Sequence, residues 1–203
     1  MTTKATTQQG TKLNHRKQDS AITFLTQEEV QRLLAAIKTK RDRAIFAVAY
    51  RHGLRASEVG MLQRTDVDLK AARITINRVK GSMSGTYPMS PDTVKLVRSY
   101  LNSRKDASPY LFISNRMLPI DRRTLLVLMK KYGTTAGLPA EKLQFHALKH
   151  SIGTHILDAG EDIYFAKDWL GHKNIQNTII YSKFSTGTRD TRARKMFSSN
   201  RVV

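Results

Sequence analysis

Apolar residues recur every three or four positions in several stretches of the chain, which is the pattern of helices that bury one face. The first stretch, 26–37, opens with Thr26 and has Glu29 three residues later, the two halves of a capping box. The second stretch, 41–52, is followed by Gly53, a residue type that often ends helices. The pattern therefore predicts two successive helices in the first quarter of the chain.

A different pattern follows, in which apolar and polar positions alternate. Residues 73–79 alternate and are rich in β-branched side chains, and 86–90 predict the returning strand of a hairpin or small three-stranded sheet. Helices are predicted over 91–104, which begins at a proline, and over 122–136. The apolar run 110–114 predicts a buried strand or extended segment. The fold class is therefore mainly α with a small antiparallel β-sheet (α+β).

Residues 145–184 combine apolar periodicity with reactive side chains. His146 and Lys149 are three apart, so they project from nearly the same side of a predicted helix, off its apolar stripe. Gly160 is expected to end this helix. The stripe is formed by Leu148, Ile152, Ile156 and Ala159.

Two more helices are expected after this one. The acidic pair Glu161 and Asp162 suits the first turn of the next helix, which ends at Gly171. A third helix begins near Asn174 and carries Tyr181. Polar groups with acid, base and nucleophile potential thus lie on packed helices, as in a catalytic site, although a basic DNA-binding surface can look similar.

The composition indicates one domain with a polyanionic partner. The chain has 203 residues, with 35 Lys plus Arg against 16 Asp plus Glu, a net charge of +19. This excess favours nucleic acid, and a basic protein kept soluble by its charge is the alternative. Cysteine is absent, which fits a reducing cytoplasm and excludes disulfides and thiolate metal sites. No apolar run approaches the roughly 20 residues of a membrane span, so we expect a cytoplasmic, nucleoid-associated protein without a membrane partner.

Changes in composition along the chain predict three segments. Residues 1–20 are polar and basic and predict a disordered arm that follows a DNA backbone, although an unstructured terminus without a function fits as well. Residues 21–184 form the folded domain, and 185–203 form a basic tail. DNA contacts are expected from Lys12, Arg16 and Lys17 of the arm and from Arg51 and Lys173 of the domain.

A short helix is predicted to start at Ser57 or a neighbour, with Val59, Met61 and Leu62 packed inward and Arg55 at the turn before it. On local grounds an arginine in a loop is most often a solvated surface charge.

Three boxes carry a resemblance to a known family. LGHKNIQNTIIY, which contains His172 and Tyr181, resembles the Leu-Gly-His signature of tyrosine recombinases (lambda-integrase-like enzymes), in which Tyr comes nine positions after His. FHALKHS resembles their His-x-x-Arg-His-Ser box, with Lys149 in place of the Arg. Gly-Leu-Arg-x-Ser-Glu at Arg55 closely resembles their first Arg box, and Lys80 resembles their hairpin lysine.

The resemblance implies the tyrosine-recombinase catalytic-domain fold and a role for each matched residue. Tyr181 is the implied nucleophile, which forms a 3′-phosphotyrosyl link, and Lys80 the implied proton donor to the leaving 5′-oxygen. The non-bridging phosphate oxygens are surrounded by Arg55, His146, Lys149 and His172. No metal or other cofactor is implied, and the histidines near Ala147 lack the carboxylate or cysteine that would complete a metal site.

The expected function is site-specific recombination or integration of duplex DNA through a Holliday junction. A homo-tetramer on two DNA sites is implied, from a protein monomeric in solution, with accessory DNA-bending proteins as further partners and the tail 185–203 exchanged between subunits. The resemblance leaves two options for the chain: a fragment of a larger family member, or a small one-domain member of the family. Two alternatives stay open: a weak or inactive DNA-binding accessory protein, since Lys149 lacks the arginine fork, and a type IB topoisomerase-like enzyme.

Overall fold

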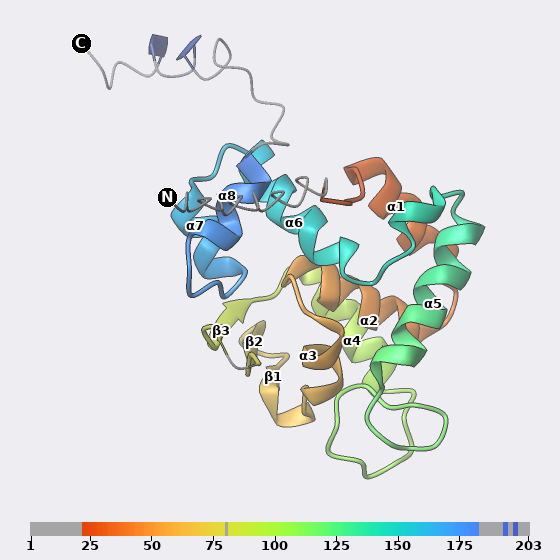
Figure 1. Cartoon of the computed structure of the whole chain (residues 1–203). Helices are drawn as coiled ribbons and strands as arrows, with labels where there is room; N and C mark the ends of the chain where they lie inside the picture. The colour runs from red at the N-terminus through yellow and green to blue at the C-terminus, as the bar shows by residue number, and fades with distance from the viewer. Residues whose placement is uncertain (1–21, 80, 183–192, 195–196, 199–203) are drawn as a thin grey trace, which may run out of the picture.

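Helices dominate the computed structural model, which describes residues 22–79, 81–182, 193–194 and 197–198. The predicted arm, Lys80 and nearly all of the tail lie outside these residues, so the assignments made to them stay predictions. Three helices precede the three strands and the other helices follow them, as Figure 1 shows. In order they are α1 (Gln27–Ala36), α2 (Lys40–Arg51), α3 (Ala56–Met61), a 3₁₀ turn (Arg64–Asp66), β1 (Val67–Asp68), β2 (Arg73–Ile76), β3 (Gly85–Pro88), α4 (Pro91–Leu101), α5 (Arg122–Thr135), a 3₁₀ turn (Ala140–Lys142), α6 (Ala147–Asp158), α7 (Ile163–Trp169) and α8 (Gln176–Ser182).

The helix ends follow the predicted capping chemistry. The Thr26 hydroxyl accepts a hydrogen bond from the Glu29 amide at 3.2 Å, and the Glu29 carboxylate accepts one from the Thr26 amide at 2.8 Å. Gly53 follows α2 with φ of +56° and Gly160 follows α6 with φ of +89°, a region that a side chain disfavours. The capping box and both glycine stops are therefore confirmed.

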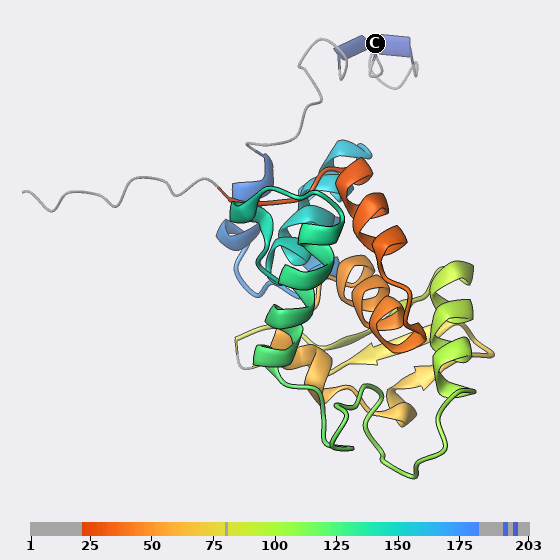
Figure 2. The same ribbon diagram turned by 90° about the vertical axis from the view of Figure 1, so that its right-hand side faces the viewer.

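The main core surrounds α2. Ala44, Ile45, Phe46, Val48 and Ala49 are fully buried, because α2 is packed against α4 on one side and α6 on another, with α1 nearby (Figure 2). The apolar run 110–114 contributes Leu111 and Phe112 as an extended segment, not a strand of the sheet. A helix apolar on nearly all sides thus becomes the centre of the domain.

The small sheet is antiparallel, in the order β1-β2-β3. Ile74 of β2 lies opposite Tyr87 of β3. The Tyr87 hydroxyl donates to the Asp168 carbonyl at 3.3 Å, so the hairpin contacts the end of α7. Both strands are shorter than predicted, but the hairpin and the three-stranded sheet are confirmed.

Two packing predictions were wrong. Met61 is 48% exposed, because α3 ends there and the chain extends at the next residue, so Leu62 takes the inward position. Ala159 is exposed at the end of α6, while Leu157 joins a second, smaller core cluster with Leu170 and Tyr181.

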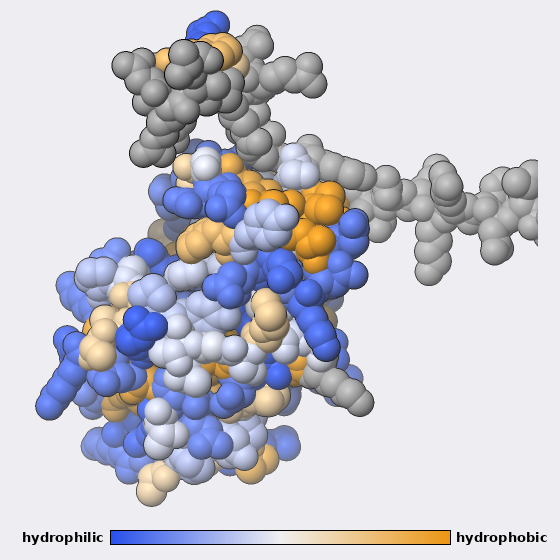
Figure 3. Space-filling model, turned by 90° about the vertical axis from the view of Figure 1, so that its left-hand side faces the viewer, coloured by the Kyte–Doolittle hydropathy of each residue, from blue (hydrophilic) through white to orange (hydrophobic). Residues whose placement is uncertain are grey.

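Exposed apolar side chains gather on one face of the domain. Phe165 on α7 and Ile179 and Ile180 on α8 are 41%, 37% and 36% exposed. Figure 3 shows this apolar area on the α7–α8 side of the molecule. Among the helices that the structure describes, each is too short or too polar to cross a membrane.

Candidate active site

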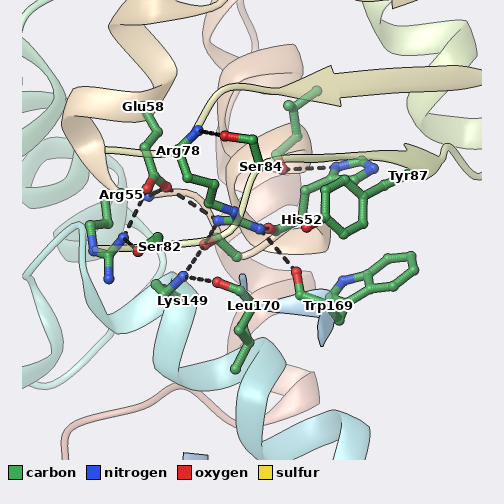
Figure 4. Close-up of polar contacts among 12 residues, drawn as sticks. His52, Arg55, Glu58, Arg78, Ser82, Ser84, Tyr87, Lys149, Trp169 and Leu170 are labelled. Atoms are coloured by element: carbon green, nitrogen blue, oxygen red, sulfur yellow. Dashed lines mark hydrogen bonds and ion pairs between the residues drawn. The ribbon is translucent and has the colours of Figure 1, made fainter. Parts of the chain in front are cut away.

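A polar junction joins the three boxes around the turn between α2 and α3. We use this name for the side chains of Glu58, Arg78 and Lys149 together with the backbone carbonyls that they bind (Figure 4). Lys149 Nζ donates to the Gly53 carbonyl at 2.8 Å and to the Leu170 carbonyl at 2.8 Å. The start of α6 is thereby tied to the Arg55 turn and to the Leu-Gly-His turn after α7.

Arg55 occupies the N-cap position of α3, at the edge of the junction. Its Nη1 donates to Glu58 Oε1 at 2.9 Å and to Ser82 Oγ at 2.8 Å. Burial opposes ionisation of Glu58, but the Arg55 backbone amide and the cations around it outweigh burial and hold the pKa of Glu58 below its usual value. The contacts of the Arg55 side chain to described residues use Nη1, so Nε and Nη2 keep their donors for a further ligand.

A groove of about 730 Å³ opens beside Arg55. Its walls include Arg122 and Arg123 from the first turn of α5, and Gln144 and His146 from the segment before α6. Cations at a helix N-terminus oppose the helix dipole, so this arginine pair does not serve helix stability. The sequence prediction missed both residues, although their place directly after the Asp121 N-cap could have indicated them.

Lys149 occupies the position where the resembling family has arginine. The side chain is 1% exposed, and burial, followed by the charge of Arg78, lowers its pKa to about 7. Two of its three ammonium hydrogens are used on carbonyls, which leaves one for a ligand. Lys149 therefore holds the polar junction together and keeps only a limited capacity to bind a further ligand.

Two histidines beside Tyr181 are neutral at pH 7. Burial, together with the charge of nearby Lys149, lowers the pKa of His172 to about 3. Burial and the neighbouring His146 lower the pKa of His150 to about 4. His172 Nδ1 lies 3.0 Å from Thr178 Oγ1, so α8 fixes its ring. His146 itself is exposed at the groove.

Tyr181 is buried on α8 and lies between α6 and His172. A Cβ atom at Gly153 would lie 2.9 Å from the tyrosine ring, so this glycine makes room for it. The ring stacks on His172 with centroids 6.2 Å apart, and the hydroxyl lies 3.1 Å from His150 Nδ1. Burial raises the pKa of Tyr181. The phenol is therefore neutral and held beside a neutral imidazole that can accept its proton.

The remaining predicted residues lie in different places. Lys173 is exposed directly after His172 and lines a shallow pocket with Gly81 and Lys167. Arg51 lines a separate pocket at Trp169 and ion-pairs with Asp92 at 3.8 Å, so the structure does not bring it to the Arg55 groove. Lys12, Arg16, Lys17 and Lys80 are outside the described residues.

The fold and these boxes define the class. The structure resembles the XerH site-specific recombinase in its post-cleavage complex with a palindromic difH substrate, with a TM-score of 0.74 and 22% identity over 89% of this chain and 54% of that chain. This is the fold of a tyrosine recombinase catalytic domain, as the sequence predicted. Residues 23–186 match the model of the phage integrase family, and the chain belongs to that family.

Two curated relatives support this assignment. Tyrosine recombinase XerA of Thermococcus kodakarensis is 40% identical over 164 residues, which are 78% of this chain and 57% of the relative. The type 1 fimbriae regulatory protein FimB of Escherichia coli is 33% identical over 172 residues, which are 81% of this chain and 86% of the relative. The chain therefore spans little more than half the length of XerA but most of the length of FimB.

Proposed function

We propose that this chain is a tyrosine-type site-specific recombinase that cuts and rejoins duplex DNA. The observation that carries the proposal is the single hydrogen-bonded cluster that unites the three boxes beside a basic groove. Lys149 bonds to the carbonyls of Gly53 and Leu170, which ties its box to the other two. Tyr181 lies beside this cluster, with its hydroxyl 3.1 Å from His150 Nδ1 and its ring stacked on His172. The XerA and FimB names and the DNA-bound XerH structure support the same class of reaction.

The proposed step is attack of the Tyr181 oxygen on the scissile phosphorus. The new Tyr181 O–P bond forms as the P–O5′ bond breaks, which leaves DNA attached through its 3′-phosphate and releases a 5′-hydroxyl. His150 accepts the phenol proton in the tautomer whose hydrogen is on Nε2, and Lys80 supplies the proton for the leaving 5′-oxygen. The intermediate keeps the energy of the phosphodiester, so rejoining needs no nucleotide.

Charge stabilisation in this step falls to the groups around the phosphate. The free edge of the Arg55 guanidinium binds two non-bridging oxygens, and His146, His172 and the last hydrogen of Lys149 complete the set. Because His172 is neutral, it acts as a hydrogen-bond donor and not as a cation. Duplex DNA follows the groove past Arg122 and Arg123.

Recombination is proposed to use a homo-tetramer on two DNA sites and a Holliday junction. The exposed apolar area on α7 and α8 supports this assembly, since it offers a surface for the tail of a neighbouring subunit. Protein monomeric in solution is expected to assemble only on DNA. Cytoplasmic, nucleoid-associated localisation follows from the proposed substrate.

One observation favours the second candidate, a weak or inactive DNA-binding accessory protein. Lys149 is buried, its pKa is near 7, and two of its donors are already used. A lysine at this position stabilises the negative charge of the phosphate less than the two parallel donors of an arginine would.

The test is covalent trapping of DNA in cells, followed by sequencing of the trapped fragments and cleavage of a nicked duplex made from them. Wild-type protein is expected to form a covalent band that disappears in Tyr181→Phe. Tyr164→Phe is the matched control, because Tyr164 is 73% exposed on α7. Binding to the enriched site without any covalent band would favour the accessory protein. Relaxation of supercoils at unrelated sequences would favour the topoisomerase.

A further inference from the structure

Arg78 is a buried arginine that the proposed reaction does not use. Its guanidinium donates to four acceptors, and Figure 4 shows it among Glu58, His52 and Trp169. Nη1 donates to the Gly53 carbonyl at 3.0 Å and to Glu58 Oε2 at 3.2 Å. Nη2 donates to the carbonyls of His52 at 3.0 Å and Trp169 at 2.9 Å. One side chain thus bonds to the α2–α3 turn, to α3 and to the end of α7.

The surroundings of Arg78 match the two terminal nitrogens of its guanidinium, whereas the buried Nε has no hydrogen-bond partner among the described residues. Its side chain is completely buried and lies over the Tyr87 ring, 5.6 Å from the centroid. A Cβ atom at Gly171 would lie 2.6 Å from Arg78 Nε and 2.6 Å from the Met83 carbonyl. The glycine of the Leu-Gly-His box is therefore required by the approach of Arg78 and of the hairpin loop. An ammonium could not reach all four acceptors at once.

The loop after Arg78 returns to the active site. The Arg78 amide donates to Ser84 Oγ at 2.9 Å, which closes the loop at its base. Within the loop, the Met83 amide donates to the Gly171 carbonyl at 2.9 Å, and Ser82 Oγ accepts from Arg55. Lys80 belongs to this loop by sequence, two residues after Arg78.

We propose that Arg78 is a positioning residue, which fixes the loop bearing Lys80 against the Arg55 turn and the His172 turn. The inference rests on the proposed function for the role of Lys80. The physical claim, that Arg78 holds the loop, can be tested separately from any reaction. Arg78 touches no DNA, since its guanidinium is buried, and it acts through the residues that it places.

The first experiment measures amide hydrogen exchange by NMR in the free protein. Arg78→Lys retains a charge for Glu58 but loses most of the carbonyl bonds. The Met83 amide is expected to exchange at least about 10-fold faster in this variant, while the Ile74 amide in β2 keeps its rate. Arg73→Lys is the matched control, because Arg73 is an exposed arginine at the start of β2, in the segment that leads to Arg78. Unchanged protection of Met83 in folded Arg78→Lys overturns the proposal.

The second experiment measures single-turnover cleavage of two versions of the trapped DNA site. Arg78→Lys is expected to slow cleavage of ordinary DNA about 100-fold, the cost of a small misplacement of a catalytic group. Sulfur at the 5′-bridging position removes the need for a proton, since thiols ionise near neutral pH. This substrate is expected to restore cleavage to within about fivefold of the wild type. An equal loss on both substrates contradicts a role through Lys80.

The two experiments separate the two proposals. If wild-type protein forms no covalent product, the proposed function fails, and the exchange rate of Met83 alone decides the role of Arg78. Arg78→Met removes the charge as well and is expected to unfold at lower temperature, because Glu58 then keeps Arg55 as its only arginine partner among the described residues. The Lys variant therefore carries the test if the Met variant does not fold.

Discussion

The apolar core around α2 and the polar junction beneath the groove are both buried, yet they are built from opposite kinds of side chain. The core uses Ile45, Phe46 and Val48 and stabilises the domain through removal of apolar surface from water. The junction buries Glu58, Arg78 and Lys149, and desolvation cancels much of what their pairing gains. Stability and catalytic geometry are therefore set by different parts of one interior.

The largest expected effect on the junction side comes from Arg55→Ala. Removing the guanidinium that binds the phosphate is expected to slow covalent product formation by about 10³-fold or more. The free energy of unfolding should fall by less than in a core variant such as Phe46→Ala, because Arg55 is partly exposed and the buried Glu58 keeps Arg78 as a partner. Arg98→Ala on α4 is the control in the same cleavage assay. If Arg55→Ala cleaves within threefold of the wild-type rate, the junction side does not set the catalytic geometry.

Phe46→Ala tests the core side. This change is expected to lower the free energy of unfolding by about 3–5 kcal/mol, because it leaves a cavity beside Tyr132 and Phe145. Cleavage per folded molecule should stay at the wild-type rate when it is measured well below the unfolding temperature. Chemical denaturation gives the first quantity and single-turnover cleavage the second. Loss of cleavage in the fully folded variant would show that the two regions are coupled.

His150 and His155 offer a matched pair on α6. His150 Nδ1 lies 3.1 Å from the Tyr181 hydroxyl, and His155 Nδ1 lies 2.8 Å from the Tyr50 hydroxyl. His150→Gln keeps a polar partner for the phenol but removes the base, so cleavage is expected to fall about 100-fold. His155→Gln should leave the cleavage rate unchanged. Equal rates for the two variants would remove His150 from the proposed reaction.

The titration of Lys149 is expected to change stability and activity in opposite directions as the pH rises. Its pKa in the folded protein is about 7, below the ordinary value of 10.5, so the folded state binds fewer protons between these two values. The penalty of burying the charge is complete below pH 7 and fades as the pH rises toward 10.5. From pH 7 to 9, wild-type protein is expected to gain about 1–2 kcal/mol of stability relative to Lys149→Met, as measured by denaturation.

Cleavage should move in the other direction over the same pH range. Deprotonation removes the charge that Lys149 supplies to the phosphate, so the wild-type rate is expected to fall about tenfold or more between pH 7 and 9. Lys149→Arg stays charged and should show a flat profile. A decline of the same size in both proteins would assign it to another group.

Much of the fold could be predicted from local sequence, because caps and periodicity act over a few residues. The Thr26 capping box, the Gly53 stop and the β2–β3 hairpin are examples. The prediction that Met61 is buried was wrong, because its exposure depends on where α3 ends, and the apolar pattern does not determine that point.

The candidate site was predictable only in part. The boxes indicated Arg55, Lys149 and Tyr181, but the role of Arg78 depends on contacts with residues 20 to 91 positions away, which no local pattern reveals. Likewise, the place of Arg122 and Arg123 after the Asp121 N-cap marks them as unusual, but only the fold brings them into one groove with His146. Long-range placement is what the sequence alone could not supply.

The most direct test of the central claim is to digest the trapped protein–DNA adduct and map the nucleotide-bearing peptide by mass spectrometry. We expect a nucleotide joined through its 3′-phosphate to the oxygen of Tyr181, together with a free 5′-hydroxyl on the other DNA end. An adduct on another residue, or a link through a 5′-phosphate, would contradict it.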